Sequence, residues 1–251
     1  MIELREIENR VLKFKPIKKS TFDLVKYVGG GQCKLKYLNF TAPDTKKLSE
    51  KKFSFSDLEI KEQFKIWQHC FLKSQIFEAK SLALIWLDGI LKAEEADFLY
   101  SHWPQLEKWS LGVSNWAHSD GLCVIYASLL ERDKKHQIYK SLKIWNQSQK
   151  PWLVRISLIS LYGYARQRRI MPNPEFVERS LCNHWDFDHH YVQKAVGWTL
   201  REYATAEPQR GKRFIFKNVR NISPTAFTTA IERFSEIDRS RIKKLRNKNR
   251  N

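Results

Sequence analysis

One helical stretch, residues 191–203, carries two kinds of side chain at helical spacing. Its predicted buried face consists of small or apolar positions, Val192, Ala195, Val196 and Thr199. Lys194, Trp198 and Arg201 are separated by four and then three residues, so they share a second face of the same helix. A cation, an indole and a second cation on one face suit a polyanion that carries flat rings. This stretch therefore predicts contact with nucleic acid.

Two shorter motifs contain side chains of the same kinds. Trp116 and Asp120 are four residues apart, which places them on one face of a predicted helix. Taken alone, such a pair is more often a half-buried tryptophan beside a surface aspartate than a functional site. Arg155 stands in Trp152-Leu-Val-Arg-Ile-Ser157, and an arginine in so apolar a segment is not expected to be sealed in the core. The plain alternative is an ordinary surface arginine.

The run Gln193-Lys-Ala-Val-Gly-Trp-Thr-Leu-Arg-Glu-Tyr203 resembles the DNA alkylation repair glycosylases of the AlkD-like family, which are built from HEAT-like helical repeats. The resemblance extends over roughly residues 20–220 and is strongest between 110 and 205. It implies that Asp120 is the catalytic carboxylate. It also implies contacts to DNA or to the lesion from Trp116, Arg155, Trp198 and Arg201, and Lys194 of the first motif lies beside them.

The chemistry implied by this resemblance is hydrolysis of the N-glycosidic bond of N3- and N7-alkylpurines in duplex DNA. Such a purine is already cationic, so it leaves without a general acid. A carboxylate near the deoxyribose stabilises the positive charge that builds there and can orient a water. No lysine nucleophile, metal or cofactor is required, so a monofunctional glycosylase is expected. Ala117 and Ser119 replace the acid and the apolar residue that relatives often carry, a departure that bears on substrate preference.

The composition agrees with an anionic partner. The chain has 251 residues, with 45 Lys and Arg against 27 Asp and Glu, a net charge of +18. Such an excess favours nucleic acid first and an acidic membrane surface second, although a generally basic protein has the same charge. Nine Trp and nine Tyr, several of them close to Lys or Arg, favour stacking platforms in a basic groove. Together with the family resemblance, this composition implies duplex DNA containing alkylated bases as the partner, bound by a monomer, without a membrane.

Other features predict the compartment. The four cysteines, at positions 33, 70, 123 and 182, form no CxxC pair and are expected to be reduced, buried thiols. The first residues are acidic where an export signal is basic and then apolar. The longest apolar run, 82–88, is far shorter than a membrane span of about 18 residues. These features predict a cytoplasmic protein that joins the nucleoid when it binds DNA.

Apolar residues recur at three and four positions through most of the chain, which predicts an all-α fold. The expected helices span 58–72, 76–92, 95–107, 115–131, 135–147, 151–167, 174–183, 189–205, 208–219 and 224–236. A weak period of about 38 residues relates Lys80, Arg155 and Lys194, with His118 near a skipped unit. Two-helix repeats of this length predict HEAT-like repeats stacked into a curved α-solenoid, with these four residues along one side.

The sequence predicts one domain, residues 1–238, followed by a basic tail, 239–251, that is helical at most in its first half. Thr41 is a predicted helix cap, with Pro43 in the first turn. The run His184-Trp-Asp-Phe-Asp-His-His190 matches no common metal-ligand spacing. Asp188 as a helix cap is the simpler interpretation of that run.

Two other functions remain open at this level. A relative could bind branched or damaged DNA without cleaving it, and retention of Asp120 with both tryptophans argues against this. A HEAT-repeat scaffold could bind proteins, and the charge of +18 argues against that.

Overall fold

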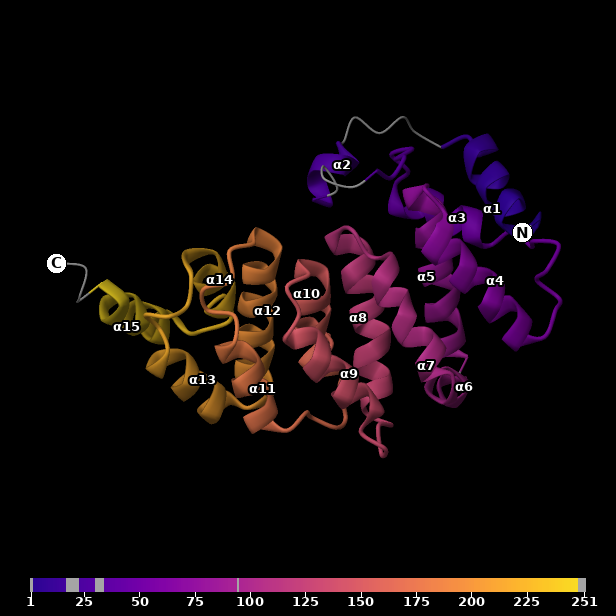
Figure 1. Ribbon diagram of the computed structural model, residues 1–251. Coiled ribbons are helices and arrows are strands. Elements are labelled where there is room, and N and C mark those ends of the chain that lie inside the picture. Colours follow the sequence, from indigo (N-terminus) through magenta and orange to yellow (C-terminus); the bar gives the residue numbers. More distant parts are fainter. Residues whose placement is uncertain (1, 17–22, 30–33, 94, 248–251) are drawn as a thin grey trace. The chain divides into compact units, whose positions relative to one another are not determined.

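The computed structural model describes residues 2–16, 23–29, 34–93 and 95–247. Within these ranges it contains helices and no strand, and one isolated parallel bridge joins Lys36 to Ile76. The predicted all-α fold is therefore confirmed (Figure 1). The backbone forms two compact units, residues 1–125 and 126–251, and their boundary lies inside helix α8 (Trp116–Leu130).

The first unit is built around two long helices. Its α-helices before α8 are α1 (Ile2–Lys13), α2 (Leu24–Tyr27), α3 (Ala42–Ser49), α4 (Ile60–Lys73), α5 (Phe77–Lys92), α6 (Ala96–Ser101) and α7 (Trp103–Leu106). Helices α1 and α3 pack on α5, α1 also packs on α4, and α4 packs on α5 and on the 3-10 helix η1 (Glu107–Gly112). The core between them is rich in aromatic rings, with Phe71 stacked on Trp109 at 5.1 Å between ring centroids.

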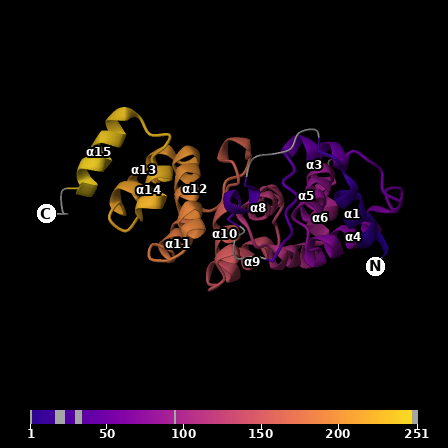
Figure 2. The same ribbon diagram turned by 90° about the horizontal axis from the view of Figure 1, so that it is seen from above.

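The second unit has two layers of helices. Its α-helices after α8 are α9 (Gln137–Asn146), α10 (Pro151–Ile159), α11 (Pro174–Cys182), α12 (His190–Ala206), α13 (Pro208–Lys217), α14 (Pro224–Ala230) and α15 (Glu236–Asn247). Helices α10, α12 and α14 pack side by side, while α9, α11 and α13 form the other layer (Figures 1 and 2). This arrangement is consistent with stacked two-helix repeats, and the HEAT-like assignment stays a prediction.

The packing of α12 on α14 depends on Gly197. A Cβ atom added there would lie 2.5 Å from the Ala226 carbonyl oxygen and 2.9 Å from the Thr229 Cβ, distances that force the helices apart. Val192, Ala195, Val196 and Thr199 are all fully buried on this helix. The predicted core face of residues 191–203 is thus confirmed. Its small residues allow two helices to approach closely.

The predicted helix starts agree with the structure better than the predicted ends. Thr41 caps α3, because its Oγ1 accepts from the Asp44 backbone N–H at 3.3 Å and the Asp44 carboxylate accepts from the Thr41 N–H at 3.1 Å. The predicted helix 95–107 is broken after Ser101, since Pro104 cannot donate a backbone hydrogen bond and clashes with the preceding turn. The predicted helix 151–167 ends at Ile159. Gly163, at φ 56°, then turns the chain.

Four predictions in the chain's second half are wrong. The segment 224–236 forms α14 and then a turn, and α15 extends the helical part of the tail to Asn247. The Ser235 hydroxyl accepts from the Asp238 N–H at 3.2 Å, which starts α15 as a separate helix. Asp188 does not cap α12, because the cap position is His189, which makes no capping bond with its side chain. Cys182 is exposed rather than buried, whereas Cys70 and Cys123 are buried and form no disulfide. Cys33 lies outside the described residues.

Two further findings bear on the sequence predictions. In the part of the chain that the structure describes, no helix has the length and apolar character needed to cross a bilayer. The description of residues 1–238 as a single domain is not tested by the division into two units, because a continuous stack of repeats can also divide in this way, and it stays a prediction.

Candidate functional site

Trp116 opens helix α8 in the first unit and is held by the α2 segment. Its Nε1 donates to the Tyr27 carbonyl oxygen at 2.6 Å, and its backbone N–H donates to the Val28 carbonyl oxygen at 3.1 Å. The Tyr27 ring meets the indole edge-on, with centroids 5.1 Å apart. The half-buried indole is therefore fixed in orientation rather than loose on the surface. Tyr27 was not predicted, and no local pattern relates it to Trp116.

Asp120 lies one turn after Trp116 on α8 and is also half-buried. The two residues between them that point inward, His118 and Ser119, are almost completely buried. Helical spacing and exposure thus place Trp116 and Asp120 together on the less buried side of the helix. An indole fixed beside a carboxylate can contact a cationic ring and a developing sugar cation at the same time.

Lys80 on α5 and His118 on the inner side of α8 are buried and do not line a surface. Lys80 is 4% exposed, and its Nζ donates to the Gly112 carbonyl oxygen at 2.9 Å. His118 is 1% exposed and stacks on Phe77 at 4.4 Å between centroids. The prediction that both residues line one side of a solenoid is therefore wrong. Each is a buried polar group with its own partner, as burial requires.

The hydrogen bonds of His118 define its protonation. Asn115 Nδ2 lies 2.9 Å from Nδ1, and because an amide nitrogen only donates, Nδ1 must accept. The proton is then on Nε2, 3.1 Å from the Ser81 hydroxyl, which donates onward to the Phe77 carbonyl oxygen at 3.0 Å. Burial, with the charge of Lys80 as the second cause, lowers the pKa of His118 to about 3. The ring is neutral throughout the physiological range.

This burial predicts that acid destabilises the protein through His118. His118 takes up a proton near pH 6.5 in the unfolded state and only near pH 3 in the folded state. The contribution of this group to the free energy of unfolding is therefore complete above pH 6.5 and is lost as the pH falls from 6.5 toward 3. Because of this group, the free energy of unfolding should fall by up to about 1.4 kcal/mol for each pH unit in that range. Urea unfolding at pH 7 and pH 5 should show a smaller pH effect in His118→Gln than in the wild type. Equal pH effects in the two proteins would contradict this assignment.

In the second unit, the predicted face of α12 is confirmed in part. Lys194 is exposed, and Trp198 and Arg201 are half-buried. The Trp198 Nε1 donates to the Gly163 carbonyl oxygen at 2.9 Å, and Tyr164 packs against the indole at 5.3 Å. The Arg201 guanidinium carbon lies 4.8 Å from the centre of the Trp198 ring. This second indole is therefore also fixed by a carbonyl and carries a cation against one face.

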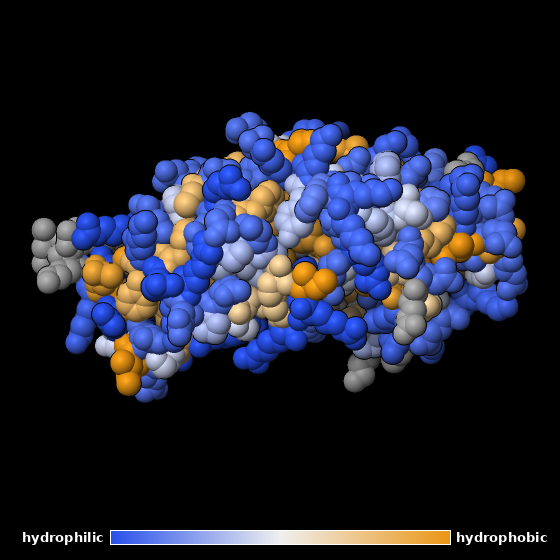
Figure 3. Space-filling view, turned by 90° about the horizontal axis from the view of Figure 1, so that it is seen from below, coloured by the Kyte–Doolittle hydropathy of each residue, from blue (hydrophilic) through white to orange (hydrophobic). Residues whose placement is uncertain are grey.

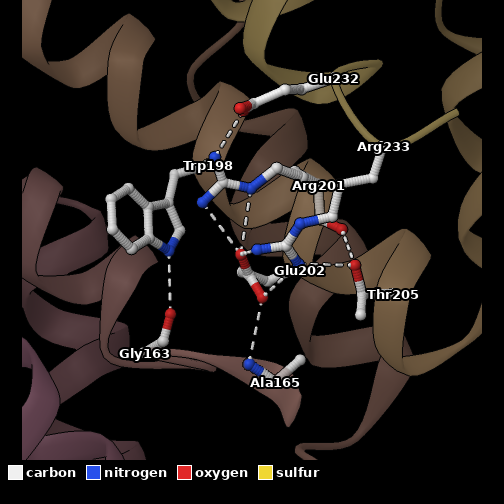
Figure 4. A network of polar contacts seen from close by, with 8 residues as sticks. All are labelled: Gly163, Ala165, Trp198, Arg201, Glu202, Thr205, Glu232 and Arg233. Carbon is white, nitrogen blue, oxygen red and sulfur yellow. Dashed lines mark hydrogen bonds and ion pairs between the residues drawn. The ribbon is translucent and has the colours of Figure 1, made fainter.

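Arg201 belongs to a network of charges that the sequence did not predict (Figure 4). Its Nη1 pairs with Glu232 at 2.7 Å, and its Nε and Nη2 both contact Glu202 at 3.0 Å. The guanidinium is therefore oriented by two carboxylates. Glu232 is 61% exposed, so water screens this pair, and a phosphate can compete for the same guanidinium.

Glu202 is the centre of this network. It is fully buried and pairs with Arg201 and with Arg233, whose Nη2 lies 3.1 Å away. Its Oε2 also accepts from the Ala165 backbone N–H at 3.1 Å. One carboxylate thus fixes two arginines and the same connection, 163–165, that accepts the Trp198 hydrogen bond (Figure 4). The sequence offered one hint that Glu202 organises this network, because this glutamate stands beside the predicted core face of α12.

Arg155 is more deeply buried than its motif predicted. Only 4% of the residue is exposed, and its Nη1 donates to the Tyr191 carbonyl oxygen at 2.7 Å, which joins α10 to the start of α12. Trp152 and Tyr191 lie beside it, with ring centroids 5.6 Å apart. The expectation that this arginine is not sealed in the core is therefore wrong. Its expected contact with the DNA backbone is not tested by this geometry and stays a prediction.

The fold and these side chains define an all-helical protein with two indoles anchored to backbone carbonyls, one beside a carboxylate in the first unit and one beside an arginine in the second. The family model described as DNA alkylation repair enzyme matches residues 25–234. The chain therefore belongs to this family of DNA alkylation repair enzymes. No match was found among curated proteins. The resemblance seen in the sequence is confirmed at the level of the family.

Proposed function

We propose that the protein is a monofunctional DNA glycosylase that hydrolyses the N-glycosidic bond of cationic N3- and N7-alkylpurines in duplex DNA. The observation that carries the proposal is the pair on α8, an oriented Trp116 and a half-buried Asp120 one turn later, in a chain of the alkylation repair family. In this proposal Asp120 is the catalytic carboxylate. Lys194 and Arg201 hold the DNA, and Trp116 and Trp198 contact the lesion. Arg155, buried against the Tyr191 carbonyl, positions the start of α12.

The chemistry follows from the charge of the substrate. An alkylated purine leaves as a neutral base, so the electron pair of the glycosidic bond goes to the ring and the sugar becomes cationic. The Asp120 carboxylate stabilises that cation and orients the water that adds to it, while the water's proton passes to solvent or to the carboxylate. A neutral base lacks this leaving ability, so substrate charge supplies part of the selectivity. Indoles add a cation–π attraction of about 1–2 kcal/mol each when desolvated.

The direct test is base release from methylated duplex DNA. The purified protein should release 7-methylguanine or 3-methyladenine without added metal and in the presence of EDTA, because no step uses a metal. Chromatography of the freed bases measures the product, and gel analysis of the strand reports on any lyase activity. Tight duplex binding without release of any cationic purine would instead favour a DNA-binding relative that does not cleave. Weak binding to all DNA would favour a protein-binding scaffold.

A further inference from the structure

The positive charge of the chain is concentrated in its second unit. Residues 1–125 contain 19 Lys and Arg against 16 Asp and Glu, whereas residues 126–251 contain 26 against 11. Within the second unit, the last 45 residues alone contain 13 basic and 4 acidic side chains. About half of the excess charge thus lies after α12. The proposed glycosylase site uses none of these side chains.

Two of the four acidic residues of this region are occupied by ion pairs within the unit. Asp238 pairs with Lys212 at 2.6 Å, and Glu232 pairs with Arg201. In the described part of the chain, Arg213, Lys217, Lys243 and Lys244 have no ion pair and are exposed. The surplus cations are therefore available to a ligand.

The cations lie on neighbouring helices. Arg213 and Lys217 are four residues apart on α13, and so share one face, away from the buried Phe214 and Ile215. Lys243 and Lys244 follow the buried Ile242 on α15. Helix α15 contacts α13 through two side chains, Asp238 on Lys212 and Arg241 over the Phe216 ring at 5.7 Å. Near the C-terminal end of the chain, Figure 3 shows hydrophilic and hydrophobic side chains interleaved.

This arrangement has an electrostatic cost that a polyanion would remove. Like charges at positions i and i+4 repel and destabilise a helix by a few tenths of a kcal/mol, as Arg213 and Lys217 must. Duplex DNA presents about one phosphate per 1.7 Å of its axis, so two helices of 10 and 12 residues face several phosphates. Cations interleaved with aromatic rings are also typical of nucleic-acid surfaces.

We propose that α13 and α15 form a second DNA-binding surface, which holds undamaged duplex phosphates outside the lesion site. The inference rests on the proposed function, since it takes DNA as the substrate of the enzyme. It assigns this surface to sequence-independent affinity and leaves the recognition of the lesion to α8 and α12. Counterion release makes such binding strongly dependent on salt.

The test compares two matched pairs of substitutions in the full chain. Arg213→Gln with Lys217→Gln removes the pair on α13, and Lys243→Gln with Lys244→Gln removes the pair on α15. The control is Lys61→Gln with Lys65→Gln, an equally exposed pair four residues apart on α4. Binding to a fluorescent, undamaged duplex is measured by anisotropy between about 50 and 200 mM NaCl. Circular dichroism and melting curves check that each variant is folded.

The quadruple variant should bind roughly tenfold or more weakly at about 0.1 M salt, and the slope of log K against log salt should flatten by about 0.9 for each phosphate that the protein no longer neutralises. The control should retain the wild-type slope. If the folded quadruple variant keeps the wild-type slope of log K against log salt, the second DNA-binding surface is refuted and the proposed function is not affected. A wild type that binds no duplex overturns the proposed function as well. Weaker binding of the quadruple variant to phosphatidylserine vesicles, with DNA binding intact, would overturn the inference in favour of a membrane surface.

Discussion

Replacing Asp120 by Asn should lower the rate of base release by about a hundredfold to a thousandfold, with DNA affinity unchanged or slightly higher. At about 4 Å and an effective dielectric near 20, a carboxylate attracts a sugar cation by about 4 kcal/mol before desolvation. Each 1.4 kcal/mol of this is worth about tenfold in rate. The amide keeps the size of the side chain but carries no charge, so the sugar cation of the transition state is stabilised less. The same change removes the repulsion between the carboxylate and DNA phosphates, so binding of the substrate does not weaken.

The measurement is single-turnover release of 7-methylguanine at saturating protein, with duplex binding followed separately. Asp88→Asn is the matched control, because Asp88 is a half-buried aspartate on another helix of the same unit, paired with Lys92 at 2.5 Å. Wild-type rates in the Asp120 variant would refute the proposed mechanism and leave the family intact. A large fall in melting temperature in the Asp120 variant alone would identify Asp120 as a structural group instead.

Removal of the Glu202 carboxylate should strongly destabilise the second unit. Glu202→Ala leaves Arg201 and Arg233 without their shared buried partner and leaves the Ala165 N–H without its acceptor. Breaking a fully buried ion pair costs about 3–5 kcal/mol. The cost here should lie near or below the lower end of that range, because Arg201 keeps Glu232 and the Arg233 side chain is 34% exposed. The connection 163–165 then loses one of its two anchors to α12, so Trp198 should also lose its fixed orientation.

Urea unfolding gives the free energy, and Trp fluorescence reports on the indole environment. Glu232→Ala serves as the control, since it removes the other carboxylate on Arg201 at a side chain that is 61% exposed, where the expected cost is at most about 1 kcal/mol. Glu202→Gln should recover part of the stability by keeping an acceptor for Ala165. Equal effects of the Glu202 and Glu232 substitutions would show that burial does not decide the strength of this network.

The sequence was sufficient for most of the long helices and for the family. Apolar residues at three and four positions predicted the long helices because only a helix brings those positions to one face, as the complete burial of Val192, Ala195 and Val196 shows. The Thr41 cap was predictable for the same local reason, since its hydrogen bonds reach only three residues ahead. The motif of α12 was long enough to identify the alkylation repair family, which the match over residues 25–234 confirms.

Tertiary structure alone decided how the polar residues of these motifs are used. The apolar neighbours of Arg155 and the repeat position of Lys80 predicted surface positions. Each residue is instead buried, and a carbonyl of a distant segment, Tyr191 or Gly112, accepts its hydrogen bond. Tyr27 meets Trp116 across 89 residues of sequence. Such pairings depend on which segments the packed helices bring together, and local spacing carries no information about partners that far away. A polar side chain is tolerated in the core only where such a partner exists, so its burial becomes known only when the fold is known.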